Sequence, residues 1–262
     1  MIPLRMAVAT RSLGEPLRRS VQIAAEMGAA GVQFDLRNEV RPGEMSETGR
    51  RQLLHYLDEL NLGVASAVFP TRRALYDLEE LEIRLAATRQ AMEFAYGLKT
   101  KVLTLRFGRI PEEADAEDYQ ILRQVLGELA RHANRVGVSL AVTPTRDDPA
   151  RLLGFLSEIK EGPVGLNYDP AIFVMSGLNP SKALELLQAH LLHVVVRDGI
   201  RDMDGSGLEV PVGRGEVEWE EVLALLGEAE YAGWLTVDRT QGDDRPGDIR
   251  RAIEYLKNVA LG

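Results

Sequence analysis

The sequence contains no cysteine among its 262 residues. This absence excludes disulfide bonds, thiol nucleophiles and zinc sites built on thiolates. No stretch approaches the roughly 20 apolar residues that a membrane-spanning helix needs. The first residues, Met1-Ile2-Pro3-Leu4-Arg5, lack the apolar core and cleavage site of a secretory signal. We therefore expect a cytoplasmic protein that does not bind membranes.

Positive charge is also in short supply. The chain has 31 Lys and Arg residues against 40 Asp and Glu residues, which gives a formal net charge of -9. An acidic surface repels phosphate backbones, so we expect no nucleic-acid partner. Sequence signatures of zinc proteases, calcium loops and serine hydrolases are lacking too. Gly213-Arg214-Gly215 is an isolated Gly-x-Gly, which we interpret as a turn, and we expect no nucleotide cofactor.

The residues that are present alternate between short apolar, β-branched runs and longer amphipathic patterns. We predict strands at 4–10, 31–37, 62–70, 102–108, 139–145, 164–170, 191–199 and 234–240. We predict helices at about 16–27, 47–60, 78–95, 116–136, 149–160, from 179 onward, 218–228 and 247–259. Eight such units in one chain of this length predict an α/β protein, a (β/α)8 TIM barrel with a single domain over residues 1–262.

Two local patterns refine this prediction. The third helix has the clearest apolar face, which we expect to comprise Leu78, Leu81, Leu85, Thr88, Met92 and Ala95. The segment 202–215 is rich in glycine, and we interpret it as a loop that leads into the helix at 218.

In such barrels the functional groups lie where the strands end. Seven of the eight predicted strands end in or beside an arginine, although the protein as a whole is acidic. These arginines could form a pocket for a phosphate or a carboxylate, which guanidinium groups bind in a bidentate manner. Alternatively, they could form a ring of salt bridges with the aspartates at the same strand ends. Both interpretations stay open, and each could apply to different arginines.

Asp169 and Asp238 are the best candidates for catalytic carboxylates. Side chains on one face of a strand repeat at every second residue. If Asp169 faces the barrel interior, Asn167 does too, and if Asp238 faces inward, Arg239 does not. Either aspartate could instead cap the loop that follows it. We expect the substrate to be bound by side chains at the ends of strands two and four to seven: Arg37, Arg106, Thr143, Asn167, Arg197 and Asp198.

Histidine and lysine offer little chemistry at the expected site. His55 and His132 fall in predicted helices, and His190 and His193 fall before or early in strand seven, so we expect structural roles for all four. None of the lysines falls at a predicted strand end, where a Schiff-base nucleophile would be needed.

Three stretches of the sequence resemble a known family. They are GVSLAVTPTRDDP (137–149), VGLNYDPAIFVMSGLNP (164–180) and LLHVVVRDG followed by VPVGRGEVEWEEVLALLGEAEYAGWLTVD (within 191–238). They are similar to the xylose isomerase-like TIM-barrel superfamily, the sugar phosphate isomerases/epimerases that also include relatives of endonuclease IV. The resemblance covers nearly the whole chain. The last stretch is the most specific, because it matches a strand-seven segment, a Gly-x-Gly-x-x-x-Trp turn and a last strand that ends in an acid.

The resemblance also implies a metal site. Family members typically hold one divalent metal through glutamate, aspartate, histidine and glutamate on strands five to eight. In this sequence the four positions are occupied by Thr143, Asp169, Val195 and Asp238. A further family histidine falls at Ile172, and the family's Lys-Asp pair becomes Arg197-Asp198. The resemblance therefore implies a divalent ion (Mg²⁺, Mn²⁺ or Zn²⁺) at Asp169 and Asp238, in a site that is weak or absent.

Two functions follow from these features. The first is an isomerase or epimerase that binds an anionic sugar, sugar phosphate or sugar acid and moves a proton next to a carbonyl, with or without the weak metal. The second is a non-catalytic descendant that binds a sugar phosphate as a sensor or as a subunit of a complex. An endonuclease IV-like repair enzyme would need a metal cluster rich in His and Glu, and a basic face, which the sequence lacks. The resemblance is compatible with a homodimer, which no feature of the sequence demonstrates.

Overall fold

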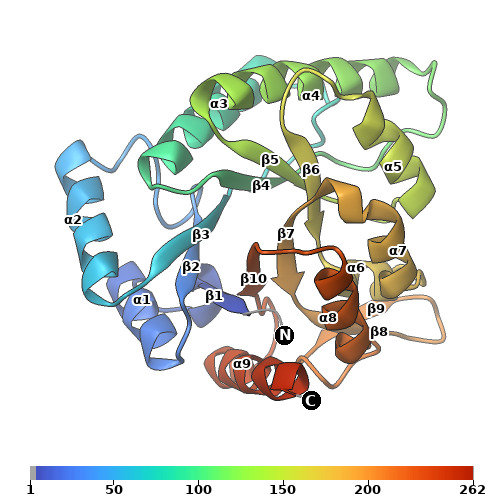
Figure 1. Cartoon of the computed structure of the whole chain (residues 1–262). Helices are drawn as coiled ribbons and strands as arrows, with labels where there is room; N and C mark the ends of the chain where they lie inside the picture. Colours follow the sequence, from blue (N-terminus) through green and yellow to red (C-terminus); the bar gives the residue numbers. More distant parts are fainter. Residues whose placement is uncertain (1–3, 262) are drawn as a thin grey trace.

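The apolar runs form the parallel strands of a closed eight-stranded barrel, as predicted (Figure 1). The computed structural model describes residues 4–261. Going round the barrel, the strand order is β1-β10-β7-β6-β5-β4-β3-β2, and all neighbours are parallel. The barrel strands are β1 (Arg5–Ala9), β2 (Gly31–Asp35), β3 (Gly63–Val68), β4 (Val102–Arg106), β5 (Ser139–Thr143), β6 (Val164–Tyr168), β7 (Leu191–Val196) and β10 (Trp234–Val237). The prediction about a secretory signal falls partly on residues 1–3, which lie outside the described residues.

Helices surround the strands and connect each one to the next (Figure 1). They are α1 (Leu17–Glu26), α2 (Glu47–Glu59), α3 (Leu81–Gly97), α4 (Glu117–Val136), α5 (Pro149–Glu158), α7 (Pro180–Leu187), α8 (Trp219–Glu228) and α9 (Arg245–Leu261). Local sequence fixes several of their starts, because the side chains of Ser46, Asp148 and Asn179 accept hydrogen bonds from the first free backbone N–H groups. Within residues 4–261, no helix combines the length and the apolar character that crossing a membrane requires.

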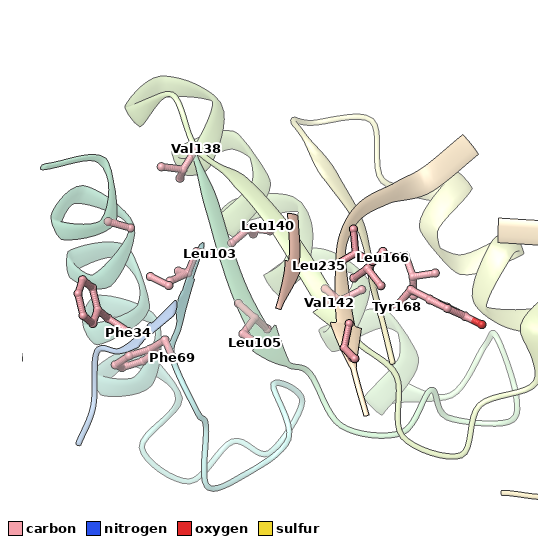
Figure 2. Packing of buried hydrophobic residues seen from close by; sticks show 14 of the residues in the cluster. Phe34, Phe69, Leu103, Leu105, Val138, Leu140, Val142, Leu166, Tyr168 and Leu235 are labelled. Atoms are coloured by element: carbon pink, nitrogen blue, oxygen red, sulfur yellow. The ribbon is translucent and has the colours of Figure 1, made fainter. Parts of the chain in front are cut away.

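The hydrophobic core lies between the strands and the helices, outside the barrel itself. Phe34, Leu105, Val142, Leu166 and Leu235 are among the buried side chains on this outer face of the strands (Figure 2). Because side chains alternate along a strand, the residues between them face the barrel interior. Those interior positions are largely small or polar, so this barrel has an apolar shell around a polar centre.

Three local features differ from the sequence prediction. The predicted seventh strand ends early, at Val196, and residues 198–210 form an antiparallel hairpin of β8 (Asp198–Arg201) and β9 (Gly207–Val210) in place of a plain loop. A short helix, α6 (Pro170–Met175), directly follows β6 and packs against β8. Helix α3 begins at Leu81, and Leu78 is 64% exposed, so placing Leu78 on its buried face was wrong. Glu80, in the left-handed conformation with φ of 54°, separates Leu78 from the helix.

Candidate functional site

A cavity of about 460 Å³ opens at the carboxyl ends of the barrel strands. Every barrel strand, or the loop directly after it, contributes to its wall. Of the residues proposed from sequence, the lining includes Arg106, Thr143, Asn167, Asp169, Arg197 and Asp238. A larger cavity of about 850 Å³ lies at the opposite end of the barrel, between α8 and α9, and is lined mostly by apolar side chains. The polar and charged groups that can do chemistry gather at the carboxyl end.

Two of the residues proposed to bind substrate lie outside this lining. The guanidinium of Arg37 donates to the Pro70 carbonyl over 2.7 Å and stacks over the ring of Phe69. The carboxylate of Asp198 accepts backbone N–H bonds from Gly199, Gly213 and Val217, at 2.9, 2.9 and 3.2 Å. Asp198 therefore organises the glycine-rich turn, and its carboxylate does not line the cavity.

Asp169 and Arg197 form a buried ion pair in the wall of the cavity. Nη1 of Arg197 donates to Oδ2 of Asp169 over 2.7 Å, and both side chains are nearly inaccessible to solvent. The other oxygen of Asp169, Oδ1, is buried and has no hydrogen-bond partner among the described residues. Burial alone would lower the pKa of Arg197, but its carboxylate neighbours, Asp169 foremost, raise that pKa above the ordinary value. The guanidinium is therefore a permanent positive charge.

Asp238 is bound by two donors from the turn after β1. Nη2 of Arg11 and Oγ of Ser12 each lie 2.5 Å from one of its carboxylate oxygens. Burial by itself would raise the pKa of Asp238, but the positive charges of Arg11 and Arg197 and these hydrogen bonds lower it. Both oxygens of this carboxylate thus accept strong hydrogen bonds, which distinguishes Asp238 from Asp169.

An uncharged hydrogen-bond network fills the barrel below the two ion pairs. His193 on β7 contacts Ser66 on β3 at 3.0 Å, Thr236 on β10 at 2.8 Å and Asn167 on β6 at 2.7 Å. Burial lowers the pKa of His193 to about 3, so its imidazole is neutral. Asn167 in turn donates to Oγ1 of Thr143 over 2.7 Å. The structural role predicted for His193 fits this arrangement.

The tautomer of His193 follows from its partners. Nδ1 faces the carbonyl oxygen of the Asn167 side chain, which only accepts, so Nδ1 carries the proton and Nε2 accepts from a hydroxyl. Since the Asn167 amide donates to Thr143, the Thr143 hydroxyl can direct its own hydrogen into the cavity.

Glu209 is a central residue that our sequence reasoning missed. It lies on β9, and its side chain is 2% exposed. Its carboxylate accepts from Nε of Arg197 over 3.2 Å, from Nη1 of Arg239 over 2.8 Å and from the backbone of Thr240 over 2.8 Å. The sequence offered only a weak signal that this residue is buried. Glu209 is a single acid between Leu208 and Val210, in a segment that we interpreted as a loop.

Arg239 continues this chain of charges away from the cavity. Its Nε donates to Asp248 on α9 over 2.9 Å, and Asp248 accepts from Arg251 over 2.7 Å. As predicted from strand alternation, Arg239 points away from the cavity that Asp238 lines. Charges of alternating sign thus run from Asp169 in the cavity wall to the surface of the last helix.

Comparison with known proteins places this barrel in a family. A family model described as xylose isomerase-like TIM barrel matches residues 21–259. The chain belongs to the xylose isomerase-like TIM-barrel family. An inosose dehydratase of Clostridium beijerinckii is 26% identical to this chain over 239 residues, which cover 78% of each chain.

Solved structures of this family have the same fold. A xylose isomerase domain protein from Planctomyces limnophilus superimposes with a TM-score of 0.83 at 23% identity, covering 91% of both chains. A D-tagatose 3-epimerase-like protein gives a TM-score of 0.80 at 20% identity, covering 98% of this chain and 97% of the other. A xylose isomerase-like protein from Mycobacterium smegmatis, solved in complex with magnesium, gives 0.76 at 18% identity, covering 99% and 96%.

A divalent metal, which the family implies, does not fit the residues that this barrel presents. Among residues 4–261 no three His, Asp or Glu side chains come together as a metal site. Val195 offers no donor atom and Thr143 offers a neutral hydroxyl, already bonded to Asn167. The two remaining acids face guanidinium groups, Asp169 that of Arg197 and Asp238 that of Arg11. A dication there would have to displace or approach fixed positive charges.

Proposed function

We propose that this protein is an enzyme that acts on a small, negatively charged, sugar-like carbonyl compound by moving a proton at the carbon next to the carbonyl. Removal of that proton is the first step of an epimerisation or an isomerisation. It is also the first step in the loss of a neighbouring hydroxyl group as water. Two of the similar proteins are named as an inosose dehydratase and a D-tagatose 3-epimerase-like protein. A dehydration and an epimerisation can both begin with this step.

The observation that carries the proposal is the state of Asp169. One of its oxygens is fixed by Arg197, and the other is buried with no hydrogen-bond partner among residues 4–261, beside a cavity lined by hydroxyl, amide and guanidinium groups. A buried oxygen without a donor is costly unless a ligand or solvent completes it. A carboxylate held in one orientation with one oxygen available is suited to act as a general base.

The charges of the cavity wall favour an anionic substrate. Arg11, Arg106 and Arg197 contribute three positive charges, and Asp169 and Asp238 contribute two negative ones. Arg106 is exposed at the end of β4, and the described residues contain no acidic partner within ion-pair distance of its guanidinium. We assign Arg106 to the anionic group of the substrate and the hydroxyl of Thr143 to a substrate oxygen. Both oxygens of Asp238 already accept a hydrogen bond, from Arg11 and from Ser12, so we assign Asp238 to orienting Arg11 and Asp169 to carrying the proton.

The test is exchange of substrate hydrogen with solvent. The protein would be incubated in D2O with ketose phosphates, keto sugar acids and neutral ketoses, and deuterium incorporation next to the carbonyl followed by NMR. We expect exchange with an anionic compound, and a loss of about 10² to 10⁴-fold in Asp169→Asn, the usual contribution of a general base. Asp115→Asn, an exposed acid in the loop after β4, is the matched control and should keep its rate.

A second function has one observation in its favour. Thr143 and Val195 occupy positions where the family resemblance implies a glutamate and a histidine, which suits a barrel that binds its ligand without transforming it. Saturable binding of an anionic sugar in calorimetry, together with no exchange for any compound, would support this sensor and overturn the enzyme.

A further inference from the structure

Two guanidinium groups lie against the same two carboxylates that the family resemblance assigns to a metal. Arg11 lies on the 3-10 turn Thr10–Leu13 after β1, and Arg197 directly follows β7. These two strands flank β10, whose end carries Asp238. The charge of Arg197 acts on Asp238 as well as on its own partner Asp169. The positive charge at the centre of this site is therefore supplied by the chain itself.

Both arginines keep hydrogen-bond donors for a ligand. A guanidinium has five N–H groups. Three hydrogen bonds to protein groups engage Arg197, one to Asp169 and two to Glu209, so two of its N–H groups remain. Arg11 makes one such bond, to Asp238, and its side chain is 31% exposed. Both residues line the cavity, so the remaining donors can reach a bound molecule.

The surroundings hold these donors in place before any ligand arrives. Glu209, fixed by Arg239 and Thr240, binds the far side of the Arg197 guanidinium. Asp238, fixed by Ser12, binds Arg11. Donors that are oriented in advance stabilise developing negative charge without a reorganisation cost during the reaction.

We propose that Arg11 and Arg197 take the place of a divalent cation in this barrel and polarise the substrate carbonyl, so that the protein works without a metal. The inference rests on the proposed function. The C–H bond next to the carbonyl breaks and its proton passes to Oδ1 of Asp169. The electron pair forms the carbon–carbon double bond of an enolate, and the negative charge on its oxygen is stabilised by N–H groups of Arg11 and Arg197. The enolate then takes a proton from solvent on the opposite face of the same carbon, which inverts its configuration, and Asp169 releases its own proton to solvent. Alternatively, Asp169 passes its proton to the hydroxyl group of the next carbon, which leaves as water while the carbonyl re-forms. Neither route needs an oxidant or a reductant.

The first experiment needs no substrate. The purified protein is dialysed against a chelator and titrated with Mg²⁺, Mn²⁺ or Zn²⁺ in a calorimeter, with Asp169→Asn and Asp238→Asn in parallel. We expect the wild type to show no saturable heat of metal binding at this site, and its titration curve to match those of the two variants. A single bound ion that disappears in either variant would overturn the proposal.

The second experiment uses the exchange reaction. Chelation should leave the rate unchanged, and Arg11→Met should lower kcat by about 10² to 10³-fold, the usual loss for one stabilising donor. Arg11→Lys, which keeps the charge, should recover part of this loss. Arg109→Met removes an exposed arginine beyond β4, whose only ion-pair partner within the described part of the chain is Glu112, and should leave kcat unchanged. Circular dichroism and thermal unfolding establish that each variant is folded.

The two hypotheses fail in different ways. If no compound exchanges its hydrogen, the proposed function is wrong, and the metal titration still decides whether the guanidinium groups exclude a dication. If exchange occurs but stops on chelation and returns with added metal, the enzyme stands and the replacement of the metal by arginine is wrong.

Discussion

Arg197 and Glu209 contact each other through a forked ion pair, in which Nε and Nη2 of the arginine both donate to Oε2 of the glutamate, at 3.2 and 2.5 Å. The pair joins the end of β7 to the β8–β9 hairpin and lies almost wholly out of solvent. Because Arg197 also binds Asp169, the hairpin contributes to the position of the candidate base. A substitution in the hairpin that breaks this ion pair should therefore change the reaction at Asp169.

Replacing Glu209 by Gln should destabilise the fold and weaken the site together. The change leaves Arg197 and Arg239 without their shared negative charge, and breaking a buried ion pair from one side costs about 3–5 kcal/mol. Urea unfolding measures this loss, and exchange kinetics should show a fall in kcat. Leu208→Ala, a 45% exposed neighbour on the same strand, is the control. Equal effects in the two variants would show that the hairpin, and not the ion pair, is responsible.

His193 should stay neutral far below the usual pH range of histidine. Its folded-state pKa of about 3 lies below the unfolded value of about 6.5. Between these two values the unfolded chain binds a proton that the folded chain does not. This group therefore contributes full stability above pH 6.5 and loses about 1.4 kcal/mol per pH unit as the pH falls toward 3. Nitrogen-15 NMR of the imidazole should report a proton on Nδ1 at pH 5, and a titration midpoint near 6 would contradict the prediction.

Arg106→Met should impair substrate binding and leave stability intact. The side chain is exposed and belongs to none of the buried ion pairs, so we expect an unchanged melting temperature. Loss of a charged hydrogen bond to an anionic group should raise KM at least about tenfold, at about 1.5–3 kcal/mol per such bond. The same change at Arg109 should leave KM as it is. If neutral and anionic sugars responded alike to Arg106→Met, the assignment of Arg106 to an anion would be refuted.

Gly215→Ala should destabilise the glycine-rich turn. A Cβ atom at this position would overlap the Asp198 carboxylate and the Gly199 carbonyl. Overpacking of this kind costs about 1–3 kcal/mol. Gly154→Ala in α5 is the matched control, because it meets no atom within 4 Å and lies in a helix, where alanine should add about 0.5–1 kcal/mol. Denaturant midpoints compare the two, and a neutral Gly215→Ala would show that the turn can open.

The barrel could be predicted because its strands are apolar in runs and its helices are apolar on one face. Residues such as Leu103, Leu140 and Leu166 face the helices and give those runs their signal. The interior was harder to foresee. Side chains such as Ser66 and Thr236 are unremarkable in the sequence, and only closure of the barrel brings both to His193.

At the cavity the sequence identified the two acids, and the structure adds their partners. Strand alternation, applied to Asp169, Asp238 and Arg239, agrees with the side of the barrel wall on which each lies. It could not supply Glu209, because the segment 202–215 was interpreted as a loop, and only the pairing of β8 with β9 and the packing of both on α6 bring Glu209 to Arg197. Of the two interpretations of the arginines, salt bridges apply to Arg11, Arg197 and Arg239. The anion pocket stays a proposal, in which Arg106 binds the anionic group.

The separation of an apolar shell from a polar centre has a consequence for how such a barrel can diverge. Side chains that hold the strands to the helices and side chains that face the cavity occupy alternate positions, so either set can be exchanged with little effect on the other. The family resemblance places two metal ligands at positions that are Thr143 and Val195 in this chain, and both residues lie buried in a barrel that is still closed. The same architecture can therefore acquire a new reaction through a few inward-facing substitutions.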